Sequence, residues 1–332
     1  MNILVPRVRS GKFRPSLLPE KWSRHESSIE DFIKDLILTG MSTNKIKQVL
    51  KTYNVSLPET FVEEVSEEIS NDFKRLTNKE LPEELICLIV DCKQTECILE
   101  NGQIGIVRVY QVFSIDFEGN REICYFEVST EPENSKKWLS IFSRLVERGL
   151  RRVLLIVTDN LAGMKDALKT VFNDSLHQLC VVHMKRSVYR NMTIKDAKQF
   201  CEEFDIIKMG NNYSSAVSSF VNLCNKYEER YPTFIKQLKQ DAALYTNFIR
   251  FPNEIRKYLY STNIIEGLNN LIECIRKNSG GYFRGDDHLL KCFAIFYNRL
   301  KMTKWSNPHP HIRGFLRELR QIFVSVFKDS VL

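Results

Sequence analysis

The stretch that most restricts how this chain can fold is residues 151–163, RRVLLIVTDNLAG. A short apolar run rich in Val and Ile, bounded by charged and turn residues, is typical of a strand buried on both faces of a sheet. Asp159 follows this run where the strand is expected to leave the sheet, and ligands bind at that edge in open α/β sheets. Asp159 or Asn160 could equally cap the next helix. This stretch alone leaves both interpretations open.

Length and composition indicate a globular protein with a sizeable core. The chain has 332 residues, of which 43% are hydrophobic and 27% charged. No apolar stretch approaches the roughly 18 residues of a membrane span, and no signal peptide is visible at Met1. Its nine scattered cysteines, an odd number, favour reduced thiols inside a cell over a disulfide framework. We therefore expect a cytoplasmic protein without a membrane partner.

The net charge of +7 is concentrated towards the two ends of the chain. Residues 1–25 contain many basic side chains and only one acid, Glu20, and residues 267–332 also have an excess of Lys and Arg. Basic segments suit a nucleic-acid partner, because phosphate contacts supply most non-specific affinity. A solvated basic face that helps solubility would give the same composition.

Residues 1–80 are expected to form a basic arm and a helical module. The arm, residues 1–28, has no hydrophobic period. Helical spacing follows in residues 29–37, is stopped at Gly40, resumes after Ser42 and continues after Pro58. Three short helices with tight turns resemble a helix-turn-helix module. The third is rich in glutamate, which would repel phosphates, so packing or dimerisation is the alternative role.

Residues 81–183 show the strand and helix pattern of an α/β sheet. Residues 85–90 form a buried apolar run that ends in Asp91, and residues 104–115 and 123–128 form a hairpin. The pattern then predicts a helix over 135–148, the strand before Asp159, a helix over 164–172 and a strand over 176–182. This order is typical of a ribonuclease H-like core with a mixed five-stranded sheet. The first and fourth strands are neighbours in that fold, which would place Asp91 beside Asp159.

The pattern of residues 184–332 predicts an insertion followed by the completion of that core. Residues 184–260 have helical periodicity without β-branched runs, which predicts an all-helical insertion. Residues 261–332 are expected to complete the core with a helix from Asn263 and two basic helices. The apolar positions of the first helix make one stripe and leave Glu266 on the opposite face. Asn263 and Glu266 also have capping-box spacing, which is a purely local alternative.

Three carboxylates at one site have a specific chemical meaning. Left alone they would repel each other, whereas divalent hard cations such as Mg²⁺ prefer oxygen ligands and neutralise them. Two ions about 3.5–4 Å apart can activate an attacking oxygen and stabilise a leaving oxygen in phosphoryl transfer. Asp91, Asp159 and Glu266 on this scaffold therefore indicate the cutting or joining of phosphodiesters.

Several segments together identify a family resemblance. They are TGMSTNKIKQVL (39–50), LIVDC (88–92), WLSIFSRLVERGLRRVLLIVTDNLAGM (138–164), QLCVVHMKRS (178–187), FPNEIRKYLYSTNIIEGLNN (251–270) and GYF (281–283). On these segments the chain resembles the Mutator-type insertion-sequence transposases of bacteria and archaea, which carry a DDE catalytic triad. The resemblance implies that Asp91, Asp159 and Glu266 are the catalytic residues and the ligands of two Mg²⁺ (or Mn²⁺) ions per active site.

The resemblance also implies the substrate and the partners. It implies a DNA transposase that binds terminal inverted repeats in double-stranded DNA, nicks strands with water and joins them to target DNA. Bringing two element ends together implies a homodimer or higher oligomer, and work on DNA implies a nucleoid-associated location. Two alternatives stay open: a catalytically idle, transposase-derived DNA-binding repressor, and a structure-selective nuclease of the same fold.

Further residues are candidates for supporting roles. The candidates for phosphate contacts are Lys12, Arg14, Arg276 and Arg284. Cys180 and His183 have zinc-like spacing, but a structural zinc site needs four ligands and no second pair stands nearby. We therefore expect a packing or hydrogen-bonding role for Cys180 and His183 beside the active site.

Overall fold

The computed structural model describes residues 27–328, except the side chains of Ser27, Ser28, Asn263 and Ile264. The basic arm, with Lys12 and Arg14, lies outside the described residues. The chain divides into two compact units. Among the described residues, the larger unit comprises Leu76–Thr95, Val107–Asn269 and 300–328, and the smaller unit comprises 27–75, Glu96–Ile106 and Asn270–Arg299. The four-part domain division expected from the sequence stays a prediction.

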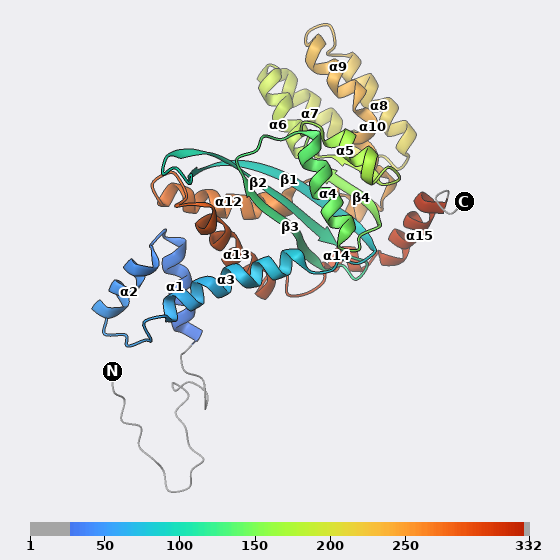
Figure 1. Ribbon diagram of the computed structural model, residues 1–332. Helices are drawn as coiled ribbons and strands as arrows, with labels where there is room; N and C mark the ends of the chain where they lie inside the picture. The colour runs from blue at the N-terminus through green and yellow to red at the C-terminus, as the bar shows by residue number, and fades with distance from the viewer. Residues whose placement is uncertain (1–26, 329–332) are drawn as a thin grey trace. The chain divides into compact units, whose positions relative to one another are not determined.

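The larger unit is built on a mixed five-stranded sheet with helices around it (Figure 1). Its strand order is β3-β2-β1-β4-β5. The strands are β1 (Glu84–Ile98), β2 (Ile104–Ile115), β3 (Arg121–Ser129), β4 (Arg152–Thr158) and β5 (Leu176–Leu179). Strands β2 and β3 are antiparallel, whereas β4 is parallel to both β1 and β5. The predicted hairpin and the predicted adjacency of the first and fourth strands are confirmed.

Two predicted strand ends are wrong. Strand β1 continues past Asp91 to Ile98. Its burial changes there from continuous to alternating, with Thr95 and Cys97 buried, so the apolar run that predicted the strand ends before the strand itself. Strand β4 stops at Thr158, so Asp91 lies beside the end of its neighbour rather than at the end of its own strand. Strand β5 ends at Leu179 instead of residue 182, because the next helix already begins at Val181.

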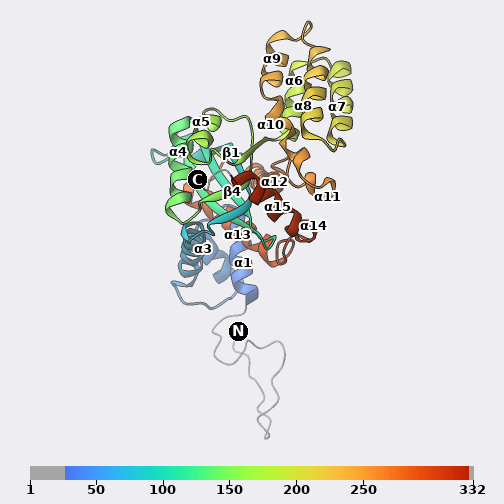
Figure 2. The same ribbon diagram turned by 90° about the vertical axis from the view of Figure 1, so that its right-hand side faces the viewer.

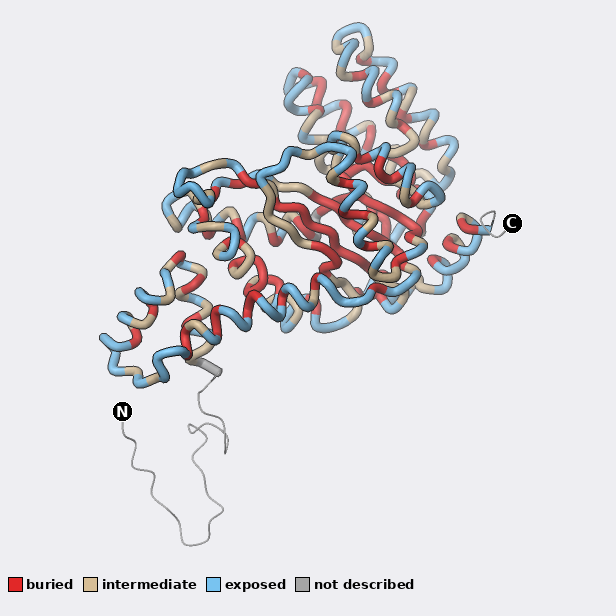
Figure 3. Tube along the Cα trace, viewed as in Figure 1, coloured by how far each residue is buried: buried red, intermediate tan, exposed pale blue. Residues whose placement is uncertain are grey.

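Helices α4 (Ser135–Glu147) and α5 (Met164–Val171) pack on the sheet. Their apolar stripes and the inner strand residues form one core, visible as the red segments of the sheet and of α4 in Figure 3. Within this core the ring of Trp138 lies edge-on against Tyr110. The amphipathic spacing of residues 135–148 therefore predicted this helix and its buried face correctly. Helix α15 (Leu316–Phe327) packs beside β4, with Arg152 over the ring of Phe323.

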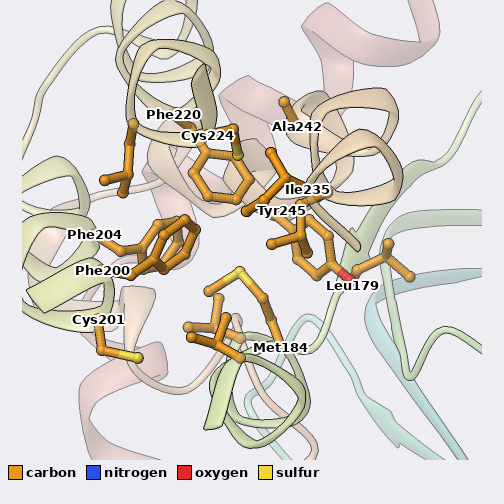
Figure 4. Close-up of a cluster of buried hydrophobic side chains, with 14 of the residues drawn as sticks. Leu179, Met184, Phe200, Cys201, Phe204, Phe220, Cys224, Ile235, Ala242 and Tyr245 are labelled. Carbon is orange, nitrogen blue, oxygen red and sulfur yellow. The ribbon is translucent and has the colours of Figure 1, made fainter. Parts of the chain in front are cut away.

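Every element described between β5 and α12 (Asn263–Asn278) is helical. These elements are α6 (Val181–Asn191), α7 (Ile194–Lys208), α8 (Tyr213–Asn225), α9 (Pro232–Gln240), α10 (Ala242–Thr246), the 3₁₀ helix η1 (Asn247–Arg250) and α11 (Asn253–Arg256). Helices α6 to α10 enclose an aromatic core of their own, with Phe220 edge-on to Phe204 (Figures 2 and 4). The helical character predicted for residues 184–260 is confirmed.

The smaller unit contains the three predicted N-terminal helices, α1 (Ser27–Leu38), α2 (Thr43–Thr52) and most of α3 (Phe61–Asn78). Gly40 adopts a left-handed φ of 78° after α1, and the Ser42 side chain caps α2. Helix α3 begins after Pro58 by way of a short turn. Its Phe73 ring packs on Phe293 of α13 (Asp286–Met302). None of the described helices is long and apolar enough to cross a bilayer.

Candidate active site

The register of two parallel strands places Asp91 and Asp159 next to each other. Val90 on β1 pairs with Thr158 on β4, and the two aspartates are the next residues along each strand. Helix α5 is capped at Gly163, which makes no side-chain cap bond, and the Asp159 carbonyl accepts from Leu161. The alternative that Asp159 or Asn160 caps this helix is therefore wrong. The continuous apolar run positions Asp159 at the sheet edge instead.

Helix α12 brings Glu266 and a second polar residue to the same edge. The Nδ2 atom of Asn269, one helical turn after Glu266, donates to Oδ2 of Asp91 at 2.7 Å. The Nε2 atom of Gln111 on β2 donates to Oδ1 of Asn269 at 2.8 Å, which fixes the orientation of the Asn269 amide. Asp91 is thus held by a partly buried chain of hydrogen bonds that joins β2, α12 and β1.

Burial and neighbouring charges shift the pKa of Asp91. Burial, and then the charges of Asp159 and Glu266, raise the pKa of Asp91, while the hydrogen bond from Asn269 and the charge of His183 lower it. The net result is a pKa of about 6. The strand register, the contacts of α12 with Asp91, and His183 between Asp159 and Glu266 place the three acids close together. Repulsion between like charges disfavours full ionisation there.

Helix α6 sets two basic side chains against these acids. Nδ1 of His183 contacts Oδ1 of Asp159, and its Nε2 atom lies 3.7 Å from Oε1 of Glu266. Burial lowers the pKa of His183, but the contacts with Asp159 and Cys180 more than offset this and raise it to about 10. Arg186, one turn further along α6, donates from Nη1 and Nη2 to the two carboxylate oxygens of Glu266. The acids thus have both an imidazole and a guanidinium as partners.

Cys180 and His183 lie beside Asp159, as expected for residues that support the site. Cys180 is buried at the start of α6, and its Sγ atom lies 3.5 Å from the hydroxyl of Thr262 just before α12. The ligand atoms of Asp159, Cys180 and His183 all lie within 4.8 Å of one another. Such a mixed O, S and N donor set is one that zinc accepts. The supporting role of the pair itself stays a prediction.

The two basic candidates that the structure describes belong to the smaller unit. Arg276 donates to Glu273, to Glu96 and to the carbonyl of Gly281, so its guanidinium is occupied by contacts within this unit. Arg284 is exposed. Phosphate contacts by Lys12, Arg14, Arg276 and Arg284 stay predictions.

The sequence interpretation missed three residues of this site: Gln111, Arg186 and Asn269. Two of them had a usable signal, because residues three apart share one face of a helix. Asn269 follows Glu266 at that spacing on α12, and Arg186 follows His183 at that spacing on α6. Gln111 is a buried polar residue in an otherwise apolar strand, which only its pairing with Asn269 explains.

We expect Asp91→Asn to stabilise the metal-free protein. The native pKa of about 6 lies above the unfolded value, so native Asp91 binds more protons and stability falls as pH rises from about 4 to 6. Asparagine removes this loss and can still accept from Asn269. The gain should be on the order of 2 kcal/mol at pH 7 and should vanish near pH 3.5. Urea denaturation in a chelator at both pH values measures it, and an equal difference at both would contradict the explanation.

Comparison with known proteins identifies the family of this chain. The family described as "Transposase, Mutator family" matches residues 1–305. The chain is 27% identical over 274 residues to the transposase for insertion sequence element IS1201 of Lactobacillus helveticus, covering 82% of this chain and 73% of the relative. It is 25% identical over 301 residues to a probable transposase for an ISRM3-like element of Sinorhizobium fredii, covering 90% and 74%. It is 25% identical over 276 residues to the transposase for IS256 in transposon Tn4001 of Staphylococcus aureus, covering 81% and 69%. The chain therefore belongs to the Mutator family of transposases.

Proposed function

We propose that this protein cleaves DNA at the terminal inverted repeats of an insertion sequence and transfers the cut strands to target DNA. Asp91, Asp159 and Glu266 are its catalytic carboxylates. The observation that carries the proposal is their convergence from β1, the residue after β4, and α12 at one edge of the sheet. The membership of the chain in a transposase family supports the reaction class.

The donor atoms at this edge fit divalent hard cations. Three carboxylates offer oxygen ligands, and burial together with their mutual repulsion raises the pKa of Asp91. The Oδ1 atom of Asp159 is buried and contacts Nδ1 of His183, so a cation would share this carboxylate with the imidazole. Asp91 and Asp159 would share two Mg²⁺ or Mn²⁺ ions, and Glu266 would hold one of them. When bound, these ions supply Lewis-acid activation of the attacking oxygen and charge neutralisation at the leaving oxygen.

The protein's own residues orient these ligands. Asn269, itself fixed by Gln111, holds one oxygen of Asp91 and leaves the other available. His183 faces Asp159 and limits the directions in which that carboxylate can point. Ligands held in place by a surrounding layer of hydrogen bonds bind a cation with less reorganisation. Gln111, His183 and Asn269 are therefore positioning residues.

The proposed fold is a ribonuclease H-like core that a helical insertion at residues 184–260 interrupts. The strand order, the parallel pairing of β1 with β4, and the helical residues between β5 and α12 support it. The proposed partners are double-stranded DNA and a second copy of the chain, in a cytoplasmic, nucleoid-associated setting. The exposed glutamates of α3, including Glu64, Glu67 and Glu68, favour packing or dimerisation over phosphate contact for that helix.

A strand-cleavage assay tests the function. The full chain is incubated with Mg²⁺ and duplexes that carry the ends of its own element, the same ends scrambled, or a branch without them. We expect nicking and joining only at the authentic ends. Cleavage of branched DNA without end preference and without joining would favour the structure-selective nuclease, and specific binding without cleavage would favour the idle repressor.

A further inference from the structure

Arg186 holds both oxygens of Glu266. Its Nη1 atom donates to Oε1 at 2.7 Å, and its Nη2 atom donates to Oε2 at 3.2 Å. The two residues are 80 positions apart in the chain and come from α6 and α12 of the larger unit. The Arg186 side chain is 49% exposed, whereas that of Glu266 is 20% exposed. The pair is therefore bidentate and open to solvent on the arginine side.

This contact conflicts with the metal-binding role proposed for Glu266. A bidentate guanidinium covers one edge of the carboxylate and uses both of its oxygens. A divalent cation that approached the same edge would face a fixed positive charge. In the metal-free protein Arg186 supplies countercharge that crowded carboxylates require. Once cations supply that charge, Arg186 is no longer needed at Glu266.

Arg186 is able to leave this position. Its side chain is half exposed, so rotation towards solvent needs no change in the core. The substrate of the proposed reaction offers phosphate oxygens, which a guanidinium binds with the same two-pronged geometry as a carboxylate. The preceding residue, Lys185, is instead paired with Asp205 of α7 at 2.7 Å. On this part of α6, Arg186 and His183 are thus the basic side chains that face the carboxylates.

We propose that Arg186 is a displaceable counter-ion, which holds Glu266 until a divalent cation binds and then passes to a phosphate of the bound DNA. This inference rests on the proposed function, because it assigns metal binding to Glu266 and DNA to the site. It makes Arg186 a positioning residue for Glu266 in the free protein and a DNA contact in the complex. Cation binding and DNA binding then favour each other. The cation replaces Arg186 at Glu266, and the DNA phosphate gives the released guanidinium a new anionic partner.

Two measurements on the full chain test the inference. The first is Mn²⁺ binding, monitored through the electron paramagnetic resonance signal of free Mn²⁺, and the second is strand cleavage. Arg186→Gln should bind Mn²⁺ about tenfold more tightly, because the cation no longer displaces a charge-assisted pair. The same variant should cleave element-end DNA at least about tenfold more slowly, because a donor to phosphate is lost. Arg186→Lys, which keeps the charge without the two-pronged geometry, should lie between. A merely structural role would weaken both properties.

Two further variants separate the possible failures. Lys185→Gln is the matched control and should change neither Mn²⁺ affinity nor cleavage, because Lys185 pairs with Asp205. Glu266→Gln should lose Mn²⁺ affinity. If Glu266→Gln loses affinity and Arg186→Gln gains none, the displacement of Arg186 is overturned and the proposed function stands. If Glu266→Gln binds Mn²⁺ as the wild type does, the carboxylate site and the displacement are overturned together.

Discussion

Replacing Asp159 by asparagine is expected to lower the rate of Mg²⁺-dependent strand cleavage by at least about 10³-fold. Asp159 lies where β4 leaves the sheet, beside Asp91 of the parallel strand, and is proposed to share both cations. Asparagine keeps the shape but removes the negative charge, and metal ions contribute several kcal/mol of charge stabilisation to such transition states. Each 1.36 kcal/mol lost slows the reaction about tenfold. Single-turnover cleavage of a labelled element-end duplex measures the effect.

Asp205→Asn is the matched control for this substitution. Asp205 is also an aspartate of the larger unit that pairs with basic side chains, but its partners are Lys185 and Lys208 rather than residues of the carboxylate site. We expect its cleavage rate to stay within about twofold of the wild type, as for a solvent-exposed ion pair. If Asp159→Asn and Asp205→Asn cleave equally fast, the assignment of Asp159 to catalysis is wrong.

Replacing Gly163 by alanine is expected to destabilise the protein by about 2–6 kcal/mol. Gly163 adopts a left-handed φ of 71°, which costs about 1–3 kcal/mol for a residue with a Cβ atom. A Cβ atom there would lie 2.2 Å from the backbone nitrogen of Ser135, so α4 and α5 could not keep their packing. Overpacking of this kind costs a further 1–3 kcal/mol or so. Chemical denaturation measures the loss.

Gly267→Ala is the control and should change the stability of the protein in the opposite direction. Gly267 follows Glu266 in α12, and a Cβ atom at this exposed position meets nothing within 4 Å. Alanine is the better helix former by about 0.8–1 kcal/mol, so this variant should gain stability of that size. The loop that begins at Asp159 ends at Gly163. Gly163→Ala should therefore also lower the cleavage rate of those molecules that remain folded. Equal stability of the two alanine variants would refute the steric explanation.

Much of the fold followed from local patterns. The continuous apolar runs before Asp91 and Asp159 predicted two buried strands, and their parallel pairing confirmed the predicted adjacency. Amphipathic spacing predicted α4 and its buried face, and the helical residues 184–260. The errors fell at strand ends. Strand β1 continues beyond Asp91 as a half-buried extension in which polar and apolar residues alternate. The prediction stopped at Asp91 because this extension carries little hydrophobic signal.

What the sequence by itself determined was which carboxylates stand at the ends of buried runs or on the polar face of a helix. Hydrophobic burial enforces these positions through a repeat that is visible within one element. The partners of those acids were decided only by tertiary structure. Arg186 meets Glu266 across 80 residues, and Asn269 meets Asp91 across 178. Such contacts depend on how α6 and α12 approach the sheet edge, and no local repeat encodes that approach. The apolar run within RRVLLIVT thus predicted that the acid after it, Asp159, lies at a sheet edge. The packing of the helices determined which charges surround that acid.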